Sequence, residues 1–162
     1  MTSRGKVIVL HFVGQMPLAG IAWQAMHYVL GLERLGYEAW YIEDGGANPY
    51  DPRANSVVME CAYNVGYVKS MMEAHGLGDR WAYWDAINDV YHGLSRERVR
   101  ALYGEADALI NLCGATRLRD TVSTHSGDSE PTVGLAVGAR SGAVPGTAPA
   151  AASISVTAES RS

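Results

Sequence analysis

The spacing of hydrophobic residues near the start of the chain predicts a strand, a loop, a helix and a second strand. Residues 6–12 form a nearly continuous apolar and β-branched run, which suits a central strand covered on both faces. Apolar residues then recur at helical spacing over residues 21–35, and Gly36 is the expected C-terminal stop of that helix. Residues 37–42 supply the second strand. This succession opens a parallel α/β sheet, in which ligands bind at the carboxyl ends of the strands.

The pattern continues with further helices and one more strand. Residues 45–53 contain glycines and two prolines, which favour a shaped loop over a strand or helix. The other expected elements are a helix from an Asn55 or Ser56 cap to His75, a short helix carrying Trp81, Trp84, Ile87 and Tyr91, a helix capped by Ser95, and a strand at residues 108–112. The fold class predicted is α/β, with a Rossmann-like three-layer parallel sheet of about three to four strands.

The composition changes abruptly near Asp120. The aromatic residues all lie between Phe12 and Tyr103, and residues 121–162 are dominated by Ser, Thr, Gly, Ala and Pro without strand or helix periodicity. Such a segment lacks the large apolar side chains that offset the conformational entropy lost on folding. We therefore predict a domain at residues 1–120 and a low-complexity tail at residues 121–162, which is disordered or encoded out of frame.

Composition and charge narrow the classes of partner. The chain has 162 residues, a net charge of −4 and a pI near 5.7, which argue against nucleic-acid binding. No apolar run reaches the length of a transmembrane segment, and the run at residues 7–13 is too short for a secretory signal. Cys61 and Cys113 are far apart, so the spacing indicates free, mostly buried thiols in the cytoplasm, with no metal site.

The loop after the first strand is the first candidate site. Gly14 and Gly20 bracket it, but neither the Gly-Lys-Ser/Thr ending of a Walker loop nor the G-x-G-x-x-G dinucleotide fingerprint is present. Backbone amides near the start of the following helix can still hold an anion or a polar ligand. His11 ends the strand beside this loop and is a candidate general base, although a hydrogen-bonded structural role is the alternative.

Two carboxylates, Glu43 and Asp44, end the second predicted strand. An acid at this point binds the ribose hydroxyls in dinucleotide enzymes. Because the glycine fingerprint is absent, ordinary solvated carboxylates are an equally good interpretation.

The succession VIVLHFVGQMPLAGIAWQAMHYVLGLERLGYEAWYIED resembles the N-terminal Rossmann-like domain of GT-B glycosyltransferases. ALYGEADALINLCG is similar to a later helix-and-strand unit of the same domain, so the resemblance covers about residues 5–120. It implies transfer of a sugar from a nucleotide-sugar donor to an unknown acceptor, in a cleft between two domains. The first domain shapes the acceptor side, and the second binds most of the donor.

The resemblance also implies roles for residues at the strand ends. In many inverting members a histidine follows the loop glycine and acts as the base. Gln15 stands at that position here and cannot take a proton, and His11, one loop segment earlier, is the candidate catalytic residue. A retaining mechanism would need no such histidine, and the sequence leaves both mechanisms open. No cofactor or metal is expected. The expected substrate-binding residues are Gly14, Gln15, Gly20, Asp44, Asn111 and Gly114.

Two functional hypotheses follow. In the first, the chain is a glycosyltransferase fragment that is inactive alone, because the donor-binding domain is lacking. In the second, it is a small stand-alone Rossmann-like module that binds a nucleotide or a protein partner through the loops at residues 13–20 and 45–53.

Overall fold

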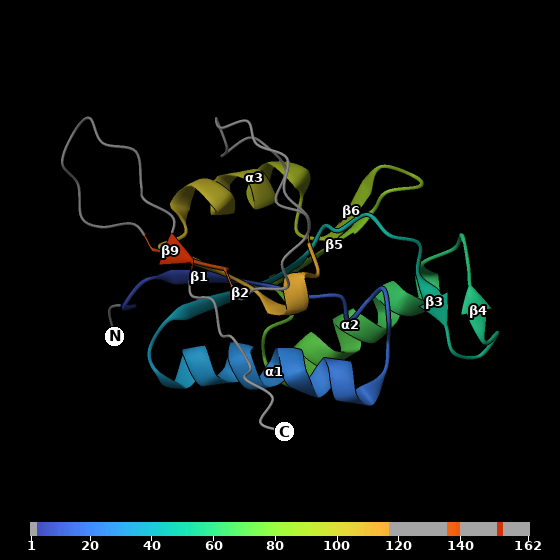
Figure 1. Cartoon of the computed structure of the whole chain (residues 1–162), viewed down its shortest axis with the longest axis horizontal. Coiled ribbons are helices and arrows are strands. Elements are labelled where there is room, and N and C mark those ends of the chain that lie inside the picture. The colour runs from blue at the N-terminus through green and yellow to red at the C-terminus, as the bar shows by residue number, and fades with distance from the viewer. Residues whose placement is uncertain (1–2, 117–135, 140–151, 154–162) are drawn as a thin grey trace, which may run out of the picture.

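Four parallel strands form the centre of the sheet in the computed structural model, which describes residues 3–116, 136–139 and 152–153 (Figure 1). Their order across the sheet is β5-β2-β1-β7, and each neighbouring pair is parallel. This order is that of the first half of a doubly wound Rossmann sheet. The strands are β1 (Lys6–Leu10), β2 (Glu38–Glu43), β5 (Trp81–Asp85) and β7 (Ala108–Asn111).

Helices cover both faces of this sheet and confirm the predicted three-layer α/β architecture. Helices α1 (Ala19–Arg34) and α2 (Ala62–Ala74) lie on one face, and α3 (Arg96–Glu105) lies on the other (Figure 1). Alternate residues of β1 supply the two cores: Val9 packs on the α1 and α2 side, and Ile8 packs on the α3 side. Strand β1 is therefore buried on both faces, as its continuous apolar sequence predicts.

Shorter strands extend and flank the parallel centre. Within the described residues, β6 (Val90–Gly93) pairs antiparallel with β5 at one edge of the sheet. At the other edge, β8 (Ala136–Ala139) pairs antiparallel with β7, and β9 (Ala152–Ser153) pairs antiparallel with β8. A separate two-stranded hairpin consists of β3 (Tyr50–Asp51) and β4 (Ser56–Val57), and a short 3-10 turn, η1 (Leu112–Gly114), follows β7.

Several predicted boundaries agree closely with the structure. Gly36 has a φ of +86°, the left-handed conformation that glycine adopts readily after a helix. The Ser95 side chain accepts a hydrogen bond from Arg98 N and caps α3, as expected. Most of the predicted tail at residues 121–162 lies outside the described residues. Strands β8 and β9 are the parts of this segment that the structure describes.

Three predicted elements were wrong. The short helix expected around residues 81–91 is the β5–β6 hairpin, because side chains on both faces of β5 are buried and no polar alternation marks the strand. The helix expected from Asn55 or Ser56 begins only at Ala62, since Ser56 pairs in β4. The loop at residues 45–53 contains β3, whose partner is β4.

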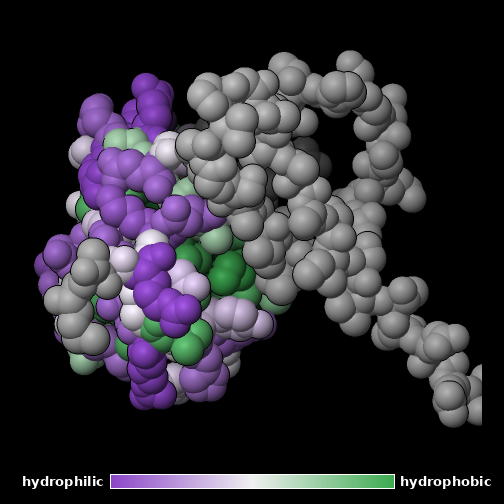
Figure 2. Space-filling view, turned by 90° about the vertical axis from the view of Figure 1, so that its left-hand side faces the viewer, coloured by the Kyte–Doolittle hydropathy of each residue, from purple (hydrophilic) through white to green (hydrophobic). Residues whose placement is uncertain are grey.

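The amino ends of the parallel strands carry mostly hydrophilic side chains (Figure 2). At this end Lys6 pairs with Glu105 of α3, which also binds Arg98. Among the described helices, none combines the length and the apolar composition that a membrane crossing requires. The loops that could form a ligand site lie at the opposite ends of the strands, where the chain leaves β1, β2 and β7 (Figure 1).

Candidate functional site

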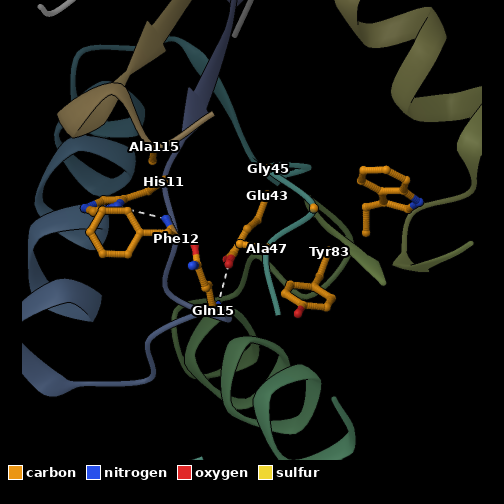
Figure 3. Close-up of a pocket in the computed structure, with 10 residues that line it drawn as sticks. His11, Phe12, Gln15, Glu43, Gly45, Ala47, Tyr83 and Ala115 are labelled. Atoms are coloured by element: carbon orange, nitrogen blue, oxygen red, sulfur yellow. Dashed lines mark hydrogen bonds between the residues drawn. The ribbon is translucent and has the colours of Figure 1, made fainter. Parts of the chain in front are cut away.

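A pocket lies at the carboxyl ends of the parallel strands, where the fold predicts a ligand site (Figure 3). Its empty volume is about 230 Å³, and part of this space is open to the solvent. The pocket therefore forms one wall of a site more readily than a complete one. The lining residues are His11, Phe12, Gln15, Glu43, Gly45, Gly46, Ala47, Tyr83, Trp84 and Ala115.

The chemically distinctive group in this pocket is the carboxylate of Glu43. The residue is only 4% exposed, so the expectation of an ordinary solvated carboxylate was wrong. Its Oε2 accepts hydrogen bonds from Gly14 N at 2.7 Å and from the Tyr41 hydroxyl at 2.8 Å, and its Oε1 accepts one from Gln15 N at 2.5 Å. The β1–α1 loop amides, predicted to hold a ligand anion, thus hold the carboxylate of the protein itself.

Burial has a large effect on the protonation of Glu43. Loss of solvation raises the pKa of this carboxyl to about 7, and the three hydrogen bonds to its ionised form only partly oppose the rise. The side chain therefore changes charge near neutral pH. A fixed carboxylate with such a pKa can take a proton from a hydroxyl group and release it again.

The loop that carries Gly14 is held in place from two sides. The Asn64 amide on α2 donates to Gly14 O at 2.7 Å and to Tyr50 O at 2.8 Å, and Tyr50 N donates to Gln15 O. A Cβ atom placed on Gly14 would lie 2.6 Å from Cδ2 of Tyr83. The glycine thus makes room for a side chain of β5, and the loop geometry is set before any ligand binds.

His11, the predicted catalytic base, lines the same pocket and is fully buried. Its Nδ1 accepts a hydrogen bond from Phe12 N at 2.9 Å (Figure 3). This bond places the ring proton on Nε2, which is 3.1 Å from the Gln24 side-chain oxygen. Burial lowers the pKa of His11 and favours the neutral imidazole. Both ring nitrogens are engaged by protein groups, and the catalytic role of His11 remains a prediction.

The structure brings only some of the other predicted residues to the pocket. Gln15 lines it, and Gly14 contributes its amide to Glu43, but Gly20 lies in the first turn of α1 outside the lining. Asp44 accepts a hydrogen bond from Tyr103 of α3 on the other side of the sheet.

Two further predicted residues lie after β7. Both ends of the Asn111 side-chain amide bind the backbone of Thr116, at 2.8 and 3.2 Å. Gly114 belongs to the turn η1 and is outside the pocket lining, where neighbouring Ala115 stands instead. The substrate-binding roles of these residues remain predictions.

Outside this pocket, the described residues hold one group of side chains that could bind a metal ion: Cys61, Asp85 and His92. Cys61 is buried and Cys113 is exposed, and both thiols are free. The prediction that both cysteines are mostly buried therefore holds for Cys61 alone.

Comparisons with protein-family models, with curated proteins and with solved structures found no match to this chain.

Proposed function

We propose that this chain is the acceptor-side half of a GT-B type glycosyltransferase and that Glu43 is its general base. The observation that carries the proposal is the position of Glu43, a buried carboxylate fixed by three hydrogen bonds at the carboxyl ends of the parallel strands. A base for sugar transfer must be held rigidly and must be unprotonated at working pH. A pKa of about 7 meets the second condition at and above neutrality.

The proposed reaction moves one proton and one glycosyl group. Glu43 takes the proton from an acceptor hydroxyl as the hydroxyl oxygen forms a bond to the anomeric carbon of the donor. The bond between that carbon and the nucleoside diphosphate breaks, and the diphosphate leaves with the electron pair. In this proposal His11 is a neutral imidazole that is hydrogen-bonded to Gln24. It forms part of the pocket wall and takes no proton.

The open form of the pocket supports the assignment to one half of an active site. Part of its empty space of about 230 Å³ is open to the solvent, so its walls would cover only one side of a sugar. Gln15 and Tyr83 supply polar and aromatic contacts of the kind that sugars use. The donor would then contact a second domain across the opening, as the GT-B resemblance implies.

The test is ligand binding by the isotope-labelled full chain at pH 8, monitored by NMR. Methyl glycosides serve as acceptor probes, and UDP-glucose and GDP-mannose serve as donor probes. We expect the glycosides to shift the signals of Gln15 and Tyr83 with millimolar affinity, and the donors to cause no comparable shift. Glu43→Gln should weaken glycoside binding about tenfold, as expected for loss of a charged hydrogen-bond acceptor.

Glu60→Gln is the matched control, because Glu60 is an exposed carboxylate outside the pocket. It should leave glycoside binding unchanged. Binding of a nucleotide sugar at this pocket without glycoside binding would favour the alternative, a stand-alone nucleotide-binding module. If Glu43→Gln and Glu60→Gln changed glycoside binding equally, Glu43 would not be part of the binding site.

A further inference from the structure

Three side chains with metal-binding atoms meet beside the start of α2. Cys61 is the residue that precedes this helix, Asp85 ends β5, and His92 lies in β6. The Cys61 sulfur is 3.3 Å from Asp85 Oδ2 and 3.8 Å from His92 Nε2. One ligand atom from each residue falls within 4.8 Å of the other two. The residues are 24 and 31 positions apart from Cys61 in the sequence, so the fold alone brings them together.

These separations fit a tetrahedral zinc ion. Zn–S bonds of about 2.3 Å and Zn–N or Zn–O bonds of about 2.0–2.1 Å, at a tetrahedral angle, place the sulfur about 3.6 Å from each of the other ligand atoms. The observed distances of 3.3 and 3.8 Å lie on either side of that value. An ion can therefore join the sulfur to either partner with shifts of a few tenths of an ångström, and the third pair, Asp85 and His92, lies within 4.8 Å.

The carboxylate of Asp85 is already oriented by other groups. Its Oδ1 accepts hydrogen bonds from Ile87 N and Asn88 N, and the Asn88 amide donates to Oδ2 at 2.7 Å. Such contacts around a ligating carboxylate are the usual outer support of protein metal sites. Support of this kind holds the ligand atom in place before the metal arrives.

We propose that Cys61, Asp85 and His92 form a zinc-binding site with one coordination position open to solvent. A thiolate, an imidazole and a carboxylate together suit Zn²⁺ better than the hard cations Mg²⁺ and Ca²⁺, which prefer oxygen ligands alone. Cys61 and Asp85 are buried, whereas His92 is only partly buried, so solvent reaches the cluster on the side of His92. The site ties the β5–β6 hairpin to α2 and is independent of the role proposed for Glu43.

The experiment uses the full chain, stripped of metal by a chelator and titrated with Co²⁺ and then Zn²⁺. We expect one Co²⁺ per chain, with the ultraviolet charge-transfer absorption of a cobalt–thiolate bond, which one equivalent of Zn²⁺ removes. Cys61→Ser should abolish the thiolate band. His92→Gln should weaken Zn²⁺ binding at least tenfold. Cys113→Ser is the matched control and should leave both signals unchanged, because Cys113 is exposed and outside the cluster.

The spectrum of the unmodified chain decides the question even if a variant fails to fold. A cobalt complex without a thiolate band, or no binding at one equivalent, would show that the Cys61 thiol only donates a hydrogen bond to Asp85. A thiolate band lost in Cys113→Ser would place the metal elsewhere. A rise in the thermal midpoint with Zn²⁺ in the unmodified chain, absent in His92→Gln, would support the site.

Discussion

At the scale of single residues, two backbone amides of the β1–α1 loop in the candidate site donate hydrogen bonds to a carboxylate of the protein itself. Free amides of this kind at the end of β1 attract anionic ligands in other α/β proteins. Here Gly14 N and Gln15 N both donate to Glu43, the last residue of β2. The parallel pairing of β1 with β2 runs to Leu10 opposite Ile42, and so brings the end of β2 close to the loop that follows β1.

Glu43 should make the stability of the fold depend on pH. Its pKa is raised from 4.5 to about 7 in the folded chain, so the folded state holds a proton that the unfolded state has lost between these values. The free energy of unfolding should therefore fall as pH rises from 4.5 to 7, by about 3 kcal/mol from this group. Urea unfolding at pH 5, 6, 7 and 8 measures this slope.

Glu43→Gln provides the comparison, since a glutamine does not titrate. The nearby groups Tyr41 and Tyr83 stay neutral over this range, because burial raises the pKa of both phenols. The variant should lose most of the decline between pH 5 and 7, whatever its absolute stability. Parallel pH dependence in the two proteins would show that Glu43 ionises at an ordinary pKa.

At the scale of elements, the first strand–helix–strand unit follows clearly from the sequence, and the β5–β6 hairpin does not. Helix α1 has one apolar stripe and a glycine stop, which give a strong periodic signal. In β5 the residues Trp81, Ala82 and Tyr83 are all buried, so no alternation separates the strand from a buried helix. The aromatic content and the Asn88–Asp89 turn were the available signals.

The candidate site is predictable in position but not in composition. The rule that ligands bind at the carboxyl ends of parallel strands places the pocket correctly, with His11 and Gln15 in its lining. The burial of Glu43 depends on contacts from the β1–α1 loop and from β5. Both segments are far from Glu43 in the sequence, so the sequence pattern around Glu43 does not predict these contacts. The cluster of Cys61, Asp85 and His92 was missed for the same reason, because its ligands lie on three separate elements.

The β1–α1 loop offers a matched pair of glycines. Gly14→Ala should destabilise the fold by about 1–3 kcal/mol, because its Cβ would lie 2.6 Å from the Tyr83 ring, which is buried and cannot move freely. A Cβ on Gly20 meets no atom within 4 Å, and Gly20 is helical. Gly20→Ala should therefore stabilise the fold by about 0.5–1 kcal/mol. Urea unfolding measures both; equal effects would contradict the packing of Tyr83 against the loop.

At the scale of the whole molecule, the described core is built from the first two thirds of the chain. Among residues 3–116, for which burial is described, the buried apolar residues lie between Val7 and Leu112, on the two faces of the parallel strands. Beyond that point, the described contribution is the antiparallel pairing of β8 with β7 and of β9 with β8. These pairings cover the β7 edge of the sheet, which would otherwise present unpaired backbone groups.

Truncation separates these two contributions. Removal of residues 121–162 should change the thermal midpoint by no more than about 2 °C, because the described apolar core is left intact. The same deletion exposes β7 and should promote self-association, measurable by light scattering. A shorter deletion of residues 140–162 keeps β8 and should leave the chain monodisperse. A fall in the midpoint of more than about 5 °C with the longer deletion would show that the C-terminal segment packs against the core and contributes to stability beyond covering the edge.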